Sequence, residues 1–522
     1  MYVSEAGSVA LTSQNQSIIE TDVVSKTSFA VLNAAQYIND ADVTAADYVA
    51  LNADLDVTNT SVLAGSYVTV NGWNNTQVRS VHASDITAGG WVTVDASEEL
   101  DNSTIAALDY VTVDANNVTN SNVDADGLID VNARTNITNS VFKGDLAGAT
   151  AVDLAAGDSI RNSGVLATSG AAVLTAGQEI DATDVQALLD ITATAGDAIS
   201  ASSFTTEAGN LDIEATAGDI VGSVFYAKGQ GAGDADGWAE IYAGDEFDHN
   251  VVETYLGIDV EATWINGSTL VSETGDVELT ARTGDIVSTS ATAKAGYVAA
   301  DAAAMIVDLT ADAAETVDVT AGIDITGGTI NAGDDATLWA QTGEINGTVV
   351  QTDTDAVLTA AVDIVGVSVD AQTADVNAGE DIVGGAVSTI SWADLDAVAD
   401  IVGTTVDADS ATLDAVRIVG VQVNTDTTAV LTARDTVQGG NVNAGTTATV
   451  LAANDIDGLA AMANGLVTLT ATAGSITASS ATSDTGAAVL TAGQEIDGTA
   501  VTAWLDITAT AGDAISASSF TT

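Results

Sequence analysis

The stretch Asp363–Gly403 reads DIVGVSVDAQTADVNAGEDIVGGAVSTISWADLDAVADIVG and contains the word DIVG three times. The three copies begin at Asp363, Asp381 and Asp400, at successive offsets of 18 and 19 in the numbering. Recurrence of one short word at a nearly constant distance is the signature of a repeat protein. The chain is therefore predicted to be built from units of about 19 residues.

The isoleucine in this word belongs to a column of apolar residues that continues in both directions. Successive members follow one another at offsets between 17 and 20 in the numbering. They are Ile325, Ile345, Ile364, Ile382, Ile401, Ile418, Val437, Ile456, Ile476, Ile496 and Ile515. Dividing 522 residues by this spacing gives about 27 units.

Within each unit, polar and apolar residues alternate with a period of two. Both Tyr67–Val70 and Tyr110–Val113 read YVTV. Period two is typical of β-strands, and the Gly, Asn, Asp and Ser residues between the short runs are typical of turns. The chain contains no Pro, which fits strands whose backbone N–H groups all donate within a ladder.

A 19-residue unit with about three short strands is too small to fold alone, but it can form one coil of a stacked repeat. Neighbouring coils would lie about 4.8 Å apart and be joined by backbone hydrogen bonds. Residues such as Val68, Val70, Ile364 and Ile382 would then face inward as apolar ladders. We predict an all-β chain in which residues 1–522 form a single long parallel β-helix, or β-solenoid, with about 19 residues per coil.

A longer repeat is superimposed on the short one. Residues 171–206 recur as residues 487–522, at an offset of 316, with 32 of 36 residues identical. Such near-identity indicates a duplication. Because the sequence stops where the second copy stops, we expect it to be part of a longer repetitive chain, or to stack head to tail with another subunit.

The words LTATAGSI at Leu469–Ile476 and LTARTGDI at Leu279–Ile286 resemble the repeats of filamentous-haemagglutinin-type exoproteins. That resemblance implies a secreted, right-handed parallel β-helix that acts as an adhesin. The motifs of that family's secretion domain are not visible in the sequence, so its secretion machinery is not implied.

Composition excludes several classes of protein. The chain has 74 acidic and 10 basic residues, a formal charge of −64 and no Cys. Disulfide scaffolds and thiolate metal sites are excluded, and a nucleic-acid binder would need a basic face that 10 basic residues cannot supply. Asp interrupts every apolar stretch before the roughly 20 residues that a membrane span needs, so we expect no membrane insertion. At 46% hydrophobic residues, the chain can still bury a long core.

The residue before the apolar column is acidic in five consecutive units. These residues are Asp324, Glu344, Asp363, Asp381 and Asp400, and Arg417 follows in the same column as a local counter-charge. Like charges stacked one coil apart would repel by roughly 0.9 kcal/mol per pair in water. Two interpretations stay open: a ladder of hard oxygen ligands for Ca²⁺, or an acidic stripe neutralised by diffuse cations.

Alternate Asp residues also occur in two Gly-bounded loops. Asp124 and Asp126 precede Gly127, while Asp234 and Asp236 lie in an insertion at residues 230–237. Such carboxylates can converge on a cation, although the same residues are ordinary turn formers and the full EF-hand pattern is absent. We predict no required cofactor and keep Ca²⁺ or another cation as a candidate ligand.

A second column is aromatic. Its members follow one another at offsets of 19, 19, 24 and 19 in the numbering and are Phe29, Tyr48, Tyr67, Trp91 and Tyr110. Because the neighbouring valines and leucines should face inward, these rings should face outward together with Thr69, Thr93 and Thr112. Such a strip could bind glycans or cell-surface proteins, or it could simply stack on itself and stabilise these coils.

Eight Asn-x-Ser/Thr sequons occur, and in a secreted chain they would be glycan acceptors. Asn59, Asn117 and Asn136 are the candidates for glycosylation.

No catalytic residues are predicted. The only two histidines, His82 and His249, lie about nine units apart, and the basic residues are scattered singly. Pairs of Asp residues are frequent only because Asp is frequent, so we expect no enzymatic activity.

We therefore expect an extracellular or cell-surface structural protein that forms a fibre or filament by stacking coils, with other copies of itself as the main partner. Two alternatives stay open: an adhesin stalk that binds through the aromatic strip, and a phage-fibre-like β-helix that binds or degrades polysaccharide. The first residues, MYVSEAGSV, lack the basic and apolar regions of a signal peptide.

Overall fold

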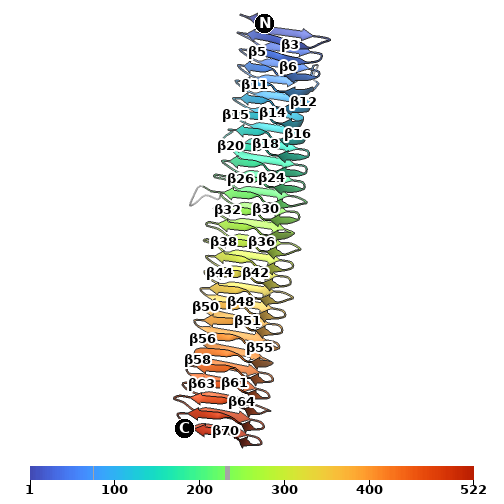
Figure 1. Cartoon of the computed structure of the whole chain (residues 1–522). Coiled ribbons are helices and arrows are strands. Elements are labelled where there is room, and N and C mark those ends of the chain that lie inside the picture. The colour runs from blue at the N-terminus through green and yellow to red at the C-terminus, as the bar shows by residue number, and fades with distance from the viewer. Residues whose placement is uncertain (74–75, 230–235) are drawn as a thin grey trace. The chain divides into compact units, whose positions relative to one another are not determined.

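The computed structural model describes residues 1–73, 76–229 and 236–522. The chain divides into two compact units. Unit 1 comprises Met1–Thr263 with Ser268–Thr274, and unit 2 comprises Trp264–Gly267 with Gly275–Thr522. The regular structure of the described residues consists of β-strands without a helix. In Figure 1, where unit 1 runs from blue to green and unit 2 continues to red, the strands of each unit lie in successive layers.

Three strands form one coil and pair with the three strands of the next coil. In unit 2, one coil consists of β48 (Asp355–Ala360), β49 (Ile364–Val365) and β50 (Ser368–Ala371). The next consists of β51 (Thr373–Ala378), β52 (Ile382–Val383) and β53 (Ala386–Thr389). All three pairings are parallel, and Ile364 lies opposite Ile382.

Unit 1 has the same architecture. The corresponding strands of five successive coils are β4 (Ala30–Ala34), β6 (Val49–Ala53), β9 (Val68–Asn71), β12 (Val92–Asp101) and β14 (Val111–Thr119). Their parallel register aligns Val49, Val68, Val92 and Val111. The predicted β-solenoid, with coils of about 19 residues, is thus confirmed for each unit. Continuity over residues 1–522, and coils beyond them, stay predictions.

The core of each unit is a set of apolar ladders. Every member of the predicted column from Ile325 to Ile496 is at most 3% exposed, whereas Ile515, in the last coil, is 46% exposed. Val68 and Val70 are fully buried, and the rings of Phe204 and Phe225 stack inside unit 1 with their centroids 5.5 Å apart. Period-two alternation therefore places one side of each strand in the core and the other in solvent.

One corner of nearly every coil contains a residue in the left-handed conformation. Asn102, Asn120 and Asn139 adopt φ values of 48° to 52° there, and Gly403 in unit 2 adopts 66°. Asn and Gly are the residues that enter this region most readily, because the side chain of Asn can form local hydrogen bonds and Gly has no Cβ. These residues fix where each coil turns.

A buried hydroxyl ladder follows this corner in unit 1. The N–H of Ser103 donates to Oγ of Ser121 (3.3 Å), and the N–H of Ser121 donates to Oγ of Ser140 (3.2 Å). The hydroxyl of Ser103 in turn donates to the carbonyl oxygen of Asp101 (2.9 Å). In this ladder the hydroxyls of Ser103 and Ser121 therefore have partners, as burial away from water requires.

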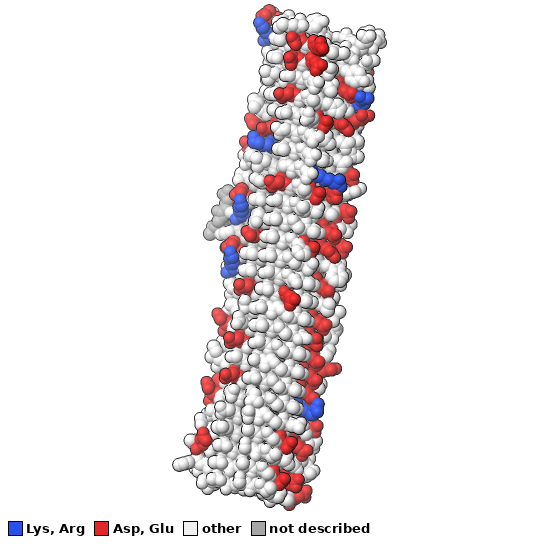
Figure 2. All heavy atoms as spheres, in the orientation of Figure 1, with Lys and Arg blue, Asp and Glu red and all other residues white. Residues whose placement is uncertain are grey.

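Most of the basic side chains join neighbouring coils. At least eight of the ten pair with an acidic side chain in the coil before or after their own. Examples are Lys26 with Glu5 (2.6 Å) and Arg134 with Asp114 (2.7 Å). Figure 2 shows the basic groups against a surface on which acidic groups predominate among the charged residues.

Candidate functional site

The five aromatic residues of the predicted strip are stacked ring on ring in unit 1. Each lies directly before a strand in the series β4, β6, β9, β12 and β14. From Phe29 to Tyr110, successive ring centroids are 4.7, 4.7, 4.4 and 5.7 Å apart, and neighbouring planes lie within 12° of parallel. We call Phe29, Tyr48, Tyr67, Trp91 and Tyr110 the aromatic stack.

Backbone hydrogen bonds set the spacing of the aromatic stack. The N–H of Val49 donates to the carbonyl oxygen of Tyr67 (3.0 Å), and the N–H of Val68 donates to that of Trp91 (2.9 Å). Each ring is consequently held one coil above the last, a spacing that suits stacked aromatic rings. Partial burial beside Tyr48 and Asp47 raises the pKa of the Tyr67 phenol above its usual value.

Two further columns flank the aromatic stack on the same face. Thr69, Thr93 and Thr112 are aligned by the register of β9, β12 and β14. Beyond them lies an amide ladder in which Nδ2 of Asn52 donates to Oδ1 of Asn33 (2.8 Å). The face therefore combines aromatic rings, small hydroxyls and amides, all of which can contact a sugar or a protein surface.

The last ring of the stack is the most accessible. Tyr110 is 39% exposed and borders a cavity of about 390 Å³, beside Leu108, which is 59% exposed. Asp109 and Asp126 also line this cavity. The stack thus stabilises itself over most of its length and presents an open apolar edge at Tyr110.

The acidic column of unit 2 lies where the sequence predicts it, one residue per coil. Three of its five carboxylates accept hydrogen bonds from the backbone of the next coil. For example, the N–H of Glu344 donates to Oδ1 of Asp324 (2.8 Å), and the N–H of Asp381 donates to Oδ1 of Asp363 (2.9 Å). Such charge-assisted bonds are stronger than neutral ones. The sequence pattern indicated the column but not these backbone donors.

Arg417 is the counter-charge of Asp400, as predicted. Its Nε donates to Oδ1 of Asp400 (3.0 Å) and its Nη2 contacts the other oxygen, so the pair is bidentate. Arg79 holds Asp56 in unit 1 in the same way, with Nε 2.9 Å from Oδ1. Both aspartates are at least nine-tenths buried, and the adjacent carboxylate raises the pKa of each arginine.

The aspartates of the two predicted Asp loops lie in different environments. Asp124 forms an ion pair with Lys143 of the next coil (3.3 Å), while Asp126 lies exposed beside Gly127. Asp236 is half-buried, and Asp234 lies outside the described residues. Among the residues that the structure describes, no group of three or more His, Cys, Asp or Glu side chains is arranged to hold a metal ion.

The candidate glycosylation residues lie in two environments. Asn59 is exposed at the left-handed corner of its coil. Asn117 and Asn136 are half-buried in neighbouring coils, where Oδ1 of Asn117 accepts from the hydroxyl of Thr135 (2.6 Å) and from Nδ2 of Asn136 (3.4 Å). Of the three, Asn59 has the more accessible amide.

Each histidine sits beside a carboxylate in a separate part of unit 1. Nδ1 of His82 is 3.8 Å from Asp101, and Nδ1 of His249 is 2.6 Å from Asp248. The structure does not bring the two histidines together, because they belong to distant coils.

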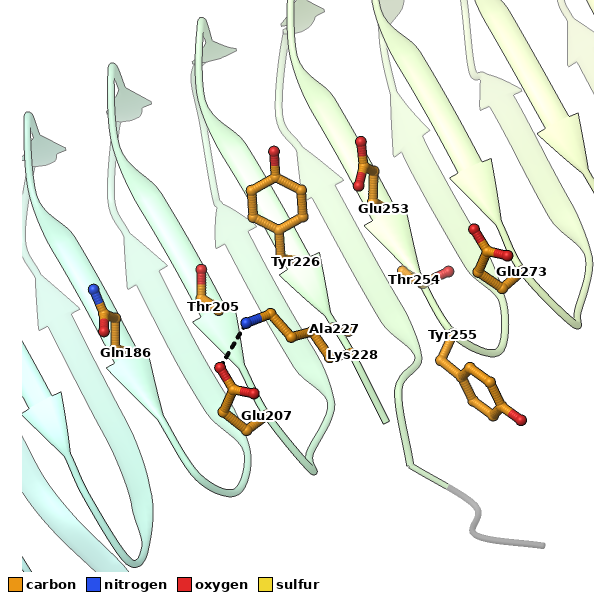
Figure 3. A pocket seen from close by; sticks show the side chains of 10 residues that line it. All are labelled: Gln186, Thr205, Glu207, Tyr226, Ala227, Lys228, Glu253, Thr254, Tyr255 and Glu273. Carbon is orange, nitrogen blue, oxygen red and sulfur yellow. Dashed lines mark hydrogen bonds and ion pairs between the residues drawn. The ribbon is translucent and has the colours of Figure 1, made fainter. Parts of the chain in front are cut away.

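Sequence analysis missed a second cavity, which Figure 3 shows. It has a volume of about 590 Å³ and lies on the outer face of unit 1, where Lys228 and Tyr255 border it. Tyr226, Lys228, Glu253 and Tyr255 are among its lining residues. These four residues belong to none of the columns described above, so the only sequence signal was the irregular spacing around the insertion at 230–237.

Comparison with protein-family models, curated proteins and solved structures finds no match to this chain. In the described ranges, no helix has the length and apolar character that crossing a membrane requires.

Proposed function

We propose that this chain is an extracellular structural protein whose stacked coils form the body of a surface fibre or filament. The observation that carries the proposal is the in-register parallel pairing of every coil with the next within each unit, over a core of fully buried apolar ladders. Structures of this kind grow by adding coils, because each coil contacts mainly its neighbours.

The architecture suits a mechanical role. Three strands of each coil bond to three strands of the next, so separating two coils along the stack breaks many backbone hydrogen bonds at once. The charge of −64 keeps such bodies apart in solution, since like-charged surfaces repel. Other copies of the same chain, meeting end to end, are the partner that this role requires.

The resemblance to filamentous-haemagglutinin-type exoproteins favours the same role. The words LTATAGSI and LTARTGDI lie in coils whose leucine and isoleucine residues, such as Leu279 and Ile476, are buried. In that family, coils of this length form secreted β-helical adhesins. We infer an extracellular or cell-surface location and a non-enzymatic function by this analogy.

Pulling on single molecules of the full chain by atomic force microscopy tests the mechanical part. We expect repeated release of chain in steps of about 65 Å, the extended length of one 19-residue coil, or in multiples of it. Antibody labelling of intact cells that make the protein tests its location. Unfolding at forces too low to detect, or labelling only after lysis, would contradict the proposal.

A second candidate function is adhesion through the aromatic stack. The half-exposed rings from Phe29 to Tyr110 and the open edge at Tyr110 favour it, because aromatic rings pack well on sugar rings and protein surfaces. In this case the rest of the chain would be the stalk that holds the stack away from the cell.

Substitution of Tyr48, Tyr67 and Trp91 by Ser in the full chain tests adhesion on glycan arrays and on cultured cells. We expect at least tenfold weaker binding, since each ring contributes about 1 kcal/mol. The matched control replaces Trp339 and Trp392, which are exposed in unit 2, with Ser. Equal loss in both variants would contradict adhesion through the stack, and release of reducing sugars would favour a polysaccharide-degrading β-helix instead.

A further inference from the structure

The 590 Å³ cavity of Figure 3 is built from two columns of outward-facing side chains in unit 1. Its strands are β23 (Asp184–Ala187), β26 (Ser203–Thr206), β29 (Val224–Ala227) and β32 (Val251–Thr254). Their register aligns Gln186, Thr205, Tyr226 and Glu253 in the first column. The second column contains Glu207, Lys228, Tyr255 and Glu273, each directly after the strand end of its coil.

Hydrogen bonds and close packing fix the corner beside this cavity. Oδ1 of Asn210 accepts hydrogen bonds from the N–H groups of Gly237 (3.0 Å) and Trp238 (2.9 Å). The N–H of Tyr255 donates to the carbonyl oxygen of Ala227 (2.8 Å), which restores the coil register. Tyr255 also packs on Gly229, where an added Cβ would lie only 2.9 Å from its ring. Regular strands beneath and a pinned corner beside it make the cavity pre-formed, as ligand sites usually are.

Acidic side chains line the cavity, and its single lysine already forms an ion pair with one of them. Nζ of Lys228 lies 2.6 Å from Oε1 of Glu207, and Figure 3 shows the two side chains pointing toward each other. Glu253 is exposed in the other column, next to the ring of Tyr226, and has no hydrogen bond or ion pair among the residues that the structure describes. Glu253 is therefore the carboxylate of the first column that a ligand can reach.

The inward side of the strand beneath the cavity contains a buried hydroxyl. Thr254 lines the cavity and is 3% exposed, and its Oγ1 has no hydrogen-bond partner within the described part of the chain. In the preceding coils, the corresponding Thr206 bonds to Gly209 (2.6 Å). Unpartnered hydroxyls recur at Thr389 and Thr425, which end the corresponding strand segments of unit 2, so this group belongs to the inward column of the coil rather than to the outer cavity.

We propose that this cavity binds a small aliphatic polyamine. One ammonium would pair with Glu253 and contact the face of Tyr226, while the methylene chain would lie against Tyr226 and Tyr255. The volume suits a small organic ligand, and the two rings favour an organic cation over a hydrated metal ion. This site does not depend on the mechanical or adhesive role proposed above.

Isothermal titration calorimetry of the full chain with spermidine, at near-physiological ionic strength, tests the proposal. Glu253→Gln should weaken binding at least about tenfold, as expected for a lost hydrogen bond to a charged group. Tyr226→Ala should weaken it about two- to fivefold through the lost cation–π contact. The control is Glu240→Gln, because Glu240 is an exposed glutamate of β30 (Ala239–Ala243) that does not line the cavity.

The design distinguishes the site from general attraction to an acidic protein. Glu240→Gln should leave spermidine affinity unchanged, and the neutral 1,4-butanediol should bind far more weakly than the diamine putrescine. Equal weakening by Glu240→Gln and Glu253→Gln would show diffuse counter-ion binding and overturn the proposal. Equal affinity for butanediol and putrescine would show recognition of a neutral chain and would overturn it as well. Circular dichroism of each variant verifies that the solenoid is intact.

Discussion

The backbone N–H of Asp400 donates to Oδ1 of Asp381 at 2.8 Å, although the two residues carry like charges in neighbouring coils. The same contact recurs along the acidic column and in other coils of unit 2, for example from the N–H of Ser475 to Asp455 (2.7 Å). In each of these contacts the carboxylate is the acceptor for a backbone amide of the next coil. The acidic column is thus part of the coil-to-coil bonding, and this explains why repulsion does not exclude it.

Replacement of Asp381 tests this role. Asp381→Ala removes the acceptor and leaves the N–H of Asp400 unpaired, so the free energy of unfolding should fall by about 1 kcal/mol. Asp381→Asn keeps an acceptor oxygen and removes a charge from the column, so it should be neutral or slightly stabilising. Chemical denaturation followed by circular dichroism measures both, and equal destabilisation by the two variants would show that the charge matters rather than the hydrogen bond.

The ion pair between Arg417 and Asp400 should matter more than exposed pairs. Arg417→Met leaves Asp400, which is 9% exposed, without its bidentate partner, and this should lower the melting temperature. Adding Asp400→Asn to this variant should restore part of the loss, because the unpaired buried charge disappears. Lys26→Met removes an exposed pair with Glu5 and should have little effect. No recovery in the double variant would contradict this account.

Asp153 of β18 (Thr150–Ala156) predicts a pH dependence. Burial, together with Asp130 one coil away, raises the pKa of this carboxyl above its ordinary value near 3.8. A raised folded-state pKa means that the stability contributed by protonation is complete below pH 3.8 and is lost as the pH rises through the folded value. Asp153→Asn should therefore raise the melting temperature at pH 7, with no difference from the unmodified chain at pH 3.5.

Asp145 provides the opposite case. Hydrogen bonds from Ser169 and Thr168 lower the pKa of its carboxyl, so its stabilising contribution is present at neutral pH and is lost as the pH falls through the lowered value. Asp145→Asn should lower the melting temperature at pH 7. If both substitutions shift the melting temperature in the same direction at pH 7, overall charge rather than local environment determines the pH response.

Two glycines of unit 2 separate backbone strain from steric conflict. Gly403 has a φ of 66° with open space around it, so Gly403→Ala should cost about 1 kcal/mol through conformation alone. At Gly445 an added Cβ would lie 1.8 Å from the carbonyl oxygen of Asp426, so Gly445→Ala should be far more destabilising. Thermal melting compares them, and an equal effect would mean that the two coils are not packed as closely as described.

Calcium tests the acidic column as a metal site. Because Oδ1 of Asp363 and of Asp381 already accept backbone hydrogen bonds, we expect Ca²⁺ and Na⁺ at matched ionic strength to raise the melting temperature equally, through screening. A larger rise in Ca²⁺ that disappears in Asp381→Asn would instead support specific coordination in the column.

The fold could be predicted from sequence because each coil of a solenoid repeats the same pattern of buried and exposed residues. The column through Ile364 and Ile382 showed the period, and alternation around Val68 and Val70 showed which side chains are buried. The spacing of the aromatic residues predicted the aromatic stack in the same way, because residues at equivalent positions in successive coils lie above one another.

The remaining features depend on information that residue spacing does not contain. The hydrogen bond from the N–H of Asp400 to Asp381 depends on the backbone conformation at the corner of the coil, which the spacing of residues along the chain does not specify. The cavity was missed because Tyr226 and Tyr255 belong to different columns and fall in adjacent coils only after the insertion is removed from the count. A cavity of about 610 Å³ lies at the corresponding corner of unit 2, where Asn331, Gln351 and Asp370 are among the lining residues and no tyrosine is present.

The corner between β29 and β30 has a practical consequence. Oδ1 of Asn210 accepts hydrogen bonds from Gly237 and Trp238, directly before β30. The parallel register then continues with Ala239 opposite Leu211. The register of β27 (Leu211–Ala215) and β30 is therefore kept although the chain between β29 and β30 is longer than in other coils. A peptide inserted between β29 and β30 should therefore leave the strand ladder of unit 1 intact.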